Sequence, residues 1–123
     1  MTMNMPLDAA NGFERQLAIL DAEFSVSLPD RLREISDACH RLLEGAATPA
    51  ELESLGLQVH KLAGSGATFG SPEISAAAAA LEVSVNTVLA GSRAEPKKVV
   101  AELSALEAAI AERLAAAPMF PGE

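Results

Sequence analysis

The most informative segment of this sequence runs from His60 to Gly70 and reads His-Lys-Leu-Ala-Gly-Ser-Gly-Ala-Thr-Phe-Gly. The histidine lies inside a strongly helical stretch, with Gly64 one turn after it and Gly56 one turn before it. A glycine in a helix interior costs roughly 1 kcal/mol relative to alanine. Two such glycines around one imidazole indicate that another molecule must come close to the ring and that larger side chains would block it.

The helical repeat places His60 on the outer face of its helix. At about 100° per residue, one face of the segment is apolar and is formed by Leu52, Leu55, Val59, Leu62, Gly66 and Phe69. His60 lies roughly 140° from the middle of that face. The residues expected around it are all small, namely Gly56, Ala63, Gly64 and Ala67. A solvated helix face usually carries Glu, Lys, Arg and Gln, so we predict an exposed imidazole on a bare platform.

Composition limits the classes of protein to consider. The 123 residues are enough for one domain, and the 25 alanines with no Trp or Tyr favour a core of closely packed helices. A net charge of −8 without a basic stripe argues against nucleic-acid binding. No apolar run approaches the roughly 18 residues of a membrane helix, and Cys39 alone fits a reducing compartment. We expect a cytoplasmic protein with no membrane partner.

Two helices are expected before residue 45. The first runs from about Gly12 to Phe24, after a capping box formed by Asn11 and Glu14. Its apolar stripe consists of Phe13, Leu17, Leu20 and Phe24. The second covers about residues 29–44 and ends at a glycine.

Three further helices follow, each opened by a proline. Thr48-Pro49-Ala50-Glu51 offers an N-cap, a first-turn proline and a capping-box glutamate for a helix that ends at about Phe69. Ser71-Pro72-Glu73 opens the next helix in the same style, and Gly91 follows its end. The last helix begins near Pro96 and ends before Pro118. The apolar stripes of these two helices are expected to face inward, and they consist of Ile74, Ala78, Leu81, Val85 and Val88 in the first and of Val99, Leu103, Leu106, Ile110 and Leu114 in the second.

Short connections make consecutive helices antiparallel. We therefore predict an all-α fold, an up-and-down antiparallel four-helix bundle with an additional short N-terminal helix against it. The bundle is expected over residues 11–117, between an N-terminal tail of residues 1–10 and a C-terminal tail of residues 118–123.

An exposed histidine can act as a base, a metal ligand or a nucleophile. A metal site is not expected, because the other histidine, His40, lies on a different helix among charged residues and no Glu-x-x-His pair is present. A flat surface offers no pocket for hydrolysis. A nucleophile that accepts a group from a docking partner needs a protruding side chain on a low platform, and His60 fits that description.

A spaced set of residues extends from this histidine into the next helix, and it comprises His60, Leu62, Gly64, Ser65, Gly70, Ile74, Ala78, Leu81 and Glu82. The set resembles the histidine-containing phosphotransfer (HPt) domains of bacterial two-component phosphorelays. That family has the same bundle fold. The chain departs from the pattern at Ala63, where the family usually has lysine.

The resemblance implies a phosphoryl carrier. A receiver domain of a hybrid histidine kinase would dock over His60, whose Nε2 would take the phosphoryl group and pass it to the receiver of a response regulator. The domain would need no ATP site of its own, and Mg²⁺ would come with the partner receiver. The residues expected at the docking face are Gly56, Leu57, Lys61, Ala63, Gly64 and Ala67. These bundles usually act as monomers.

The sequence leaves three points open. Lys61 lies about 100° around the helix from His60, so it is a poor substitute for the lysine replaced by Ala63. The alternative function is therefore a non-phosphorylated bundle that binds and regulates a receiver. Leu57 would contact either a receiver or the N-terminal helix, and the hydrogen-bond partner of the His60 Nδ1 atom is not identified.

Overall fold

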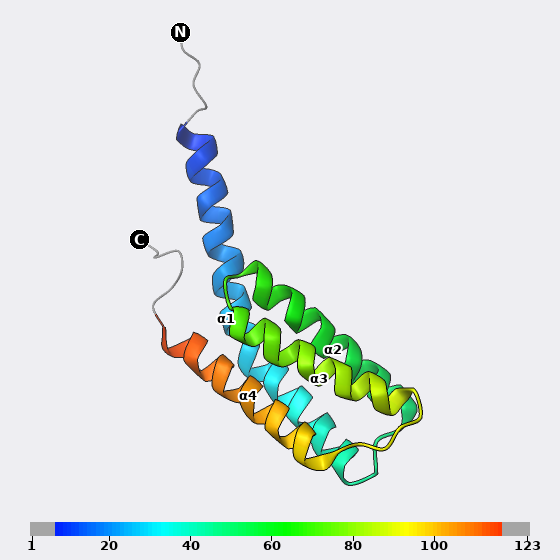
Figure 1. The fold of residues 1–123 in the computed structure, drawn as a ribbon. Coiled ribbons are helices and arrows are strands. Elements are labelled where there is room, and N and C mark those ends of the chain that lie inside the picture. The colour runs from blue at the N-terminus through cyan, green and yellow to red at the C-terminus, as the bar shows by residue number, and fades with distance from the viewer. Residues whose placement is uncertain (1–6, 117–123) are drawn as a thin grey trace.

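Four helices form the part of the chain that this computed structural model describes, residues 7–116, with side chains described from residue 12. They are α1 (Leu7–Leu43), α2 (Pro49–Thr68), α3 (Pro72–Leu89) and α4 (Pro96–Ala115), and the described residues contain no strand. Each helix contacts two others, in the order α1, α2, α3, α4 and back to α1, which gives an up-and-down bundle (Figure 1). The predicted all-α four-helix architecture is confirmed.

The core consists of small and aliphatic side chains from all four helices. The largest side chains that are less than 2% exposed are Leu28, Ile35, Leu55, Leu62, Ile74, Leu81, Leu106, Ile110, Val59, Val85, Val99 and Cys39. Most of them are the residues that the helical repeat placed inward in α2, α3 and α4. The bundle therefore forms because each of these helices carries one apolar stripe.

The prediction of a separate N-terminal helix is wrong, because α1 is continuous and contains Pro29. Apolar spacing continues across the proline: Phe24, Leu28 and Ile35 are all buried. An interior proline costs about 3 kcal/mol, whereas each fully buried apolar side chain contributes about 1.5–3 kcal/mol. Pro29 itself is exposed. Burial of the apolar side chains before and after it therefore outweighs the free-energy cost of the proline.

The first turns of α1 project beyond the rest of the bundle (Figure 1). Phe13 is 65% exposed and Leu20 is 39% exposed, whereas Phe24 is buried, so only the end of the predicted N-terminal stripe packs against the bundle. The capping box expected at Asn11 and Glu14 is also wrong, since α1 begins at Leu7. Residues 7–10 of the expected tail are helical, whereas residues 1–6 and the tail at 118–123 lie outside the described residues.

The start of α2 follows the predicted capping box. The Glu51 backbone N–H donates to the Thr48 hydroxyl at 3.1 Å, and the Thr48 N–H donates to the Glu51 carboxylate at 2.8 Å. This backbone donor, with a smaller contribution from Arg41, lowers the pKa of Glu51. Gly70 lies in the turn between α2 and α3 and has a φ of 72°, a conformation that favours glycine.

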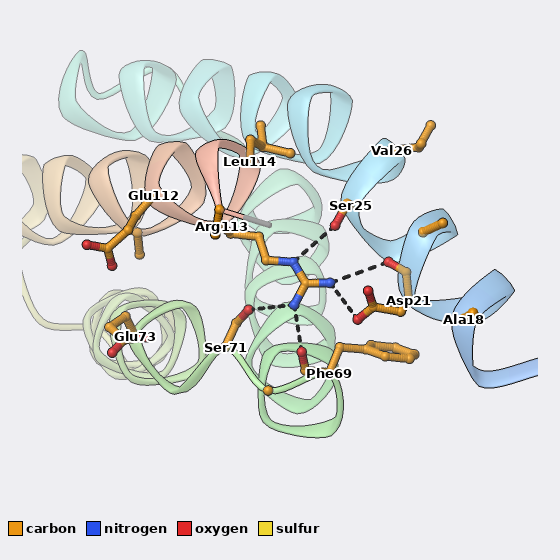
Figure 2. A pocket seen from close by; sticks show the side chains of 14 residues that line it. Ala18, Asp21, Ser25, Val26, Phe69, Ser71, Glu73, Glu112, Arg113 and Leu114 are labelled. Carbon is orange, nitrogen blue, oxygen red and sulfur yellow. Dashed lines mark hydrogen bonds and ion pairs between the residues drawn. The ribbon is translucent and has the colours of Figure 1, made fainter. Parts of the chain in front are cut away.

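The end of the bundle nearest the α2–α3 turn is held together by Arg113 of α4 (Figure 2). Its guanidinium donates to the Asp21 carboxylate at 2.7 Å and to the Phe69 carbonyl at 2.6 Å. It also donates to the Ser71 hydroxyl at 3.0 Å. Ser71 occupies the N-cap position of α3, as expected, but its side chain makes no capping hydrogen bond. Its hydroxyl instead accepts a hydrogen bond from Arg113, which joins the turn to α4.

Candidate functional site

His60 lies in the middle of α2 with its side chain 69% exposed. Its Nδ1 atom lies 2.9 Å from Oε2 of Glu82, a residue of α3 that is 24% exposed at its side chain. α2 and α3 pack side by side, and this places the two residues opposite each other. The predicted exposure of the imidazole is confirmed, and its Nδ1 partner is identified.

The contact with Glu82 determines which ring nitrogen can react. An ionised carboxylate only accepts hydrogen bonds, so in the neutral ring the Nδ1 atom carries the proton and donates a hydrogen bond to Glu82. The lone pair then belongs to Nε2, for which no hydrogen-bond partner occurs in the described part of the chain. A neutral imidazole with a free Nε2 on an open surface is a nucleophile accessible to a second protein.

The surface around the ring is low, as predicted. Gly64 and Ala67 are exposed, and a Cβ atom added at Gly64 would meet nothing within 4 Å. Lys61 is exposed and Leu57 is 54% exposed. Ala63 is half-buried and packs against the core. These five residues therefore surround His60 without covering it.

Gly56 was placed on the same outward face, and this prediction is wrong. Gly56 is buried, and a Cβ atom there would lie 3.5 Å from Oδ1 of Asn86 and 3.7 Å from a methyl group of Val85. The helical repeat correctly places Gly56 about 40° from His60. α3 covers that edge of α2, however, so a residue one turn away from the exposed histidine lies beneath a neighbouring helix.

Among the glycines of α2, Gly66 has the least room for a side chain. An added Cβ atom would lie 2.9 Å from the backbone nitrogen of Ser75 and 3.1 Å from the carbonyl oxygen of Ser71. The Gly66 carbonyl also accepts a hydrogen bond from the Ser71 N–H at 2.7 Å. Gly66 thus lets the start of α3 lie directly against α2, which fixes the register that brings Glu82 to His60.

Other kinds of site find no support in the described residues. Across residues 12–116, no three His, Cys, Asp or Glu side chains gather as metal ligands. None of the four helices has an apolar stretch long enough to cross a bilayer. His40 is exposed near the end of α1, and no hydrogen bond of its side chain occurs in the described structure.

Comparison with known families identifies the bundle. The family model described as Hpt domain matches residues 20–116, which is most of the chain. The chain belongs to the Hpt domain family. Hpt domains take part in phosphotransfer in two-component signalling, as phosphoryl carriers rather than kinases, and typically interact with receiver domains. No curated protein and no solved structure matches the chain.

The Hpt match starts close to the place where α1 enters the bundle. Residues 7–19, the projecting turns of α1, precede it. His60, Glu82 and the five residues around the ring all lie within the match. Sequence reasoning included Glu82 in the Hpt pattern but assigned it no role. The pairing with His60 depends on the register between two helices, which no local signal specifies.

Proposed function

We propose that this Hpt domain relays a phosphoryl group between receiver-domain aspartates, from a hybrid histidine kinase to a response regulator, through His60. The observation that carries the proposal is the exposed imidazole whose Nδ1 atom is held by Glu82 at 2.9 Å. That hydrogen bond orients the ring and leaves the Nε2 lone pair for reaction with phosphorus.

The transfer can be written with balanced bonds and charges. The Nε2 lone pair attacks the phosphorus atom of a receiver phosphoaspartate, and the bond between phosphorus and the aspartyl oxygen breaks. The receiver regains a free carboxylate, and His60 becomes a phosphoimidazolium that keeps its Nδ1 proton. The Glu82 carboxylate accepts that proton in a hydrogen bond and stabilises the cationic ring. A second receiver aspartate then attacks phosphorus and releases Nε2.

The domain itself contributes little charge to neutralise the phosphoryl group. Ala63 occupies the position where the Hpt family usually has lysine, and its methyl group packs against the core. Phosphoryl transfer depends on electrostatic stabilisation of the spread negative charge. We propose that the receiver supplies this stabilisation through its own Mg²⁺ and lysine.

The docking face proposed for the receiver is the surface that Leu57, Lys61, Ala63, Gly64 and Ala67 form around His60. Leu57, with half of its surface exposed, is its largest apolar side chain, and the separate N-terminal helix that it could have contacted is not formed. Gly64 and Ala67 keep the approach open. One chain supplies both His60 and Glu82, so we propose that the protein acts as a monomer. We also propose that it acts in the cytoplasm, where receivers act.

A second function is favoured by Ala63 alone. A bundle that binds a receiver without accepting its phosphoryl group would need the platform but not the missing lysine. Ala63→Lys distinguishes the two functions, because it should lengthen the lifetime of the phosphohistidine in a carrier. In a pure adaptor, no phosphohistidine forms in either version of the protein.

The test is incubation with a phosphorylated receiver and Mg²⁺. The carrier accepts label that is labile in acid and stable in alkali, and His60→Gln accepts none. A wild-type protein that binds the phosphorylated receiver but takes up no label would be the adaptor instead.

A further inference from the structure

A pocket of about 490 Å³ opens at the end of the bundle where the chain leaves α4 (Figure 2). Its walls are formed by α1 between Ala18 and Val26, by the turn between α2 and α3, by the start of α3 and by the last turns of α4. Ala116, the last residue that the structure describes, also lines it. The chain therefore continues from the edge of this pocket.

The pocket presents apolar surface that no described residue covers. Val26 is 79% exposed and Leu114 is 46% exposed, although both line the pocket. Ala22 adds a small apolar side chain to the α1 wall. Phe69 is half-buried in another wall, where its ring stacks on Phe24 with the two centroids 5.2 Å apart. Removal of this surface from water would stabilise the fold.

An anionic ligand does not suit the pocket. The guanidinium of Arg113 has five N–H groups, and in this structure it makes five hydrogen bonds, to acceptors on Asp21, Ser25, Phe69 and Ser71. It therefore has no donor left for a bound anion. The exposed carboxylates of Glu73 and Glu112 also line the pocket. An uncharged, apolar occupant fits these walls best.

A second copy of the chain is a poor occupant for the same reason. Each copy carries a net charge of −8, and Glu73 and Glu112 add local negative charge at the pocket. Like charges repel when two such surfaces approach.

The segment that follows Ala116 has the composition that the pocket requires. Residues 117–122 read Ala-Pro-Met-Phe-Pro-Gly and contain no charged side chain. Met119 and Phe120 supply two large apolar side chains within this short segment. The segment belongs to the same chain, so its docking does not bring a second charge of −8 to the pocket.

The segment is also long enough to reach across the pocket. The backbone of Ala116 is already extended, with φ −80° and ψ 159°. An extended residue spans at most about 3.3–3.6 Å, so Phe120, four residues later, can lie up to about 13–14 Å from Ala116. The α1 wall from Ala18 to Val26 is about 12 Å long at the helical rise of 1.5 Å per residue. The Phe120 ring can therefore reach this wall.

We propose that this pocket is the docking site of the chain's own residues 117–122, with the Phe120 ring between α1 and α4 next to Phe69. The inference goes beyond the proposed function, because no lining residue of the pocket belongs to the surface around His60. The docked segment joins the end of α4 to α1. It also covers an apolar patch of the kind that otherwise promotes association between proteins.

The first experiment uses fluorescence. The chain contains no tryptophan and no tyrosine, so Phe120→Trp introduces a single probe into the full chain. Val100→Trp is the control, because Val100 is a half-exposed residue of α4 outside the pocket. The probe at position 120 should emit at shorter wavelength than the control and should be quenched several-fold less by acrylamide. Equal emission and equal quenching in the two proteins would overturn the inference.

A blocked pocket tests where the probe lies. Ala22→Glu places a carboxylate in the α1 wall, whereas Ala101→Glu makes the same change at an exposed position near the start of α4, outside the pocket. Combined with Phe120→Trp, the first should raise quenching to the level of the Val100→Trp control, and the second should leave it low. A probe that stays protected in both variants is covered somewhere else, which would contradict the proposal.

Thermal unfolding tests the native phenylalanine without a probe. Phe120→Ala should lower the Tm by about 5 °C or more, but it should have almost no effect in the Ala22→Glu background, because the two changes remove the same contact. Equal losses in both backgrounds would refute the docking. The fluorescence is also measured over a range of protein concentrations. Protection that increases with concentration would assign the pocket to a second copy and overturn the intramolecular assignment.

Discussion

Oε2 of Glu82 lies 2.9 Å from Nδ1 of His60, although the two residues are 22 positions apart and belong to different helices. The contact gives the exposed ring one fixed orientation and one tautomer. It also couples the fold to the proposed chemistry, because any change in the register of α2 against α3 would move Glu82 away from the ring.

Removal of the Glu82 carboxylate should slow phosphoryl transfer without unfolding the bundle. A carboxylate partner that orients a metal-ligating histidine is typically worth about 10- to 100-fold, and we expect a loss of similar size for Glu82→Ala. Glu82→Gln keeps an acceptor without the charge and should fall between Ala and the wild type. Single-turnover transfer from a phosphorylated receiver measures both, and equal rates in all three proteins would refute the role of Glu82.

Substitution of Gly64 should separate stability from function. The site is open, so Gly64→Gln should stabilise the helix by about 0.5–1 kcal/mol. The longer side chain should nevertheless slow transfer by crowding the approach to His60. Thermal unfolding and transfer kinetics measure the two effects. An unchanged transfer rate would show that the bare surface next to the ring is unnecessary.

The two buried glycines of α2 should respond in opposite directions to alanine. At Gly66 the new methyl group would lie 2.9 Å from a backbone nitrogen, and overpacking of this kind costs about 1–3 kcal/mol. At Gly56 its nearest neighbours would lie at the ordinary distances of 3.5 and 3.7 Å, so the gain in helix propensity of roughly 1 kcal/mol should dominate. Urea unfolding should place Gly66→Ala below the wild type and Gly56→Ala at or above it.

Much of the bundle could be predicted from local signals. The capping box at Thr48 and the inward stripes of α2, α3 and α4 are local properties. The structure confirms them except at the end of α4, where Leu114 is 46% exposed. The continuity of α1 could not be predicted by the same route, because Pro29 and the apparent capping box at Asn11 are local stop and start signals. Tertiary burial of Leu28 and Ile35 on either side of the proline overrides them.

The candidate site, like the fold, could be predicted from the sequence only in part. The exposure of His60 follows from the helical repeat of its own helix. The burial of Gly56 and the pairing with Glu82 both depend on how closely α3 approaches α2. The close approach at Gly66 permits this packing, and sequence reasoning recorded Gly66 only as one member of an apolar face.

Cys39 should make the stability of the protein depend on pH in alkaline solution. Burial, with smaller contributions from Glu102 and Glu107, raises the pKa of its thiol from 9.0 to about 11. The unfolded chain therefore loses this proton at lower pH than the folded protein. Stability should fall as pH rises from about 9 to about 11, by roughly 2–3 kcal/mol in total.

The control for this pH dependence is Cys39→Val, which keeps an apolar side chain of similar size. Both proteins share the same lysines and contain no tyrosine, so the difference between their stability curves isolates the thiol. Chemical denaturation at a series of pH values should give a flatter alkaline limb for the variant. Parallel curves would show that Cys39 titrates alike in the folded and unfolded states.

The most direct test of the relay is to locate the phosphorus atom on the ring. NMR of the ¹⁵N-histidine-labelled protein, phosphorylated by a receiver, should show a phosphoryl group on Nε2 of His60, with Nδ1 still protonated. His40→Gln should give the same signal and His60→Gln should give none. A phosphoryl group on Nδ1, or a signal that survives in His60→Gln, would contradict the account.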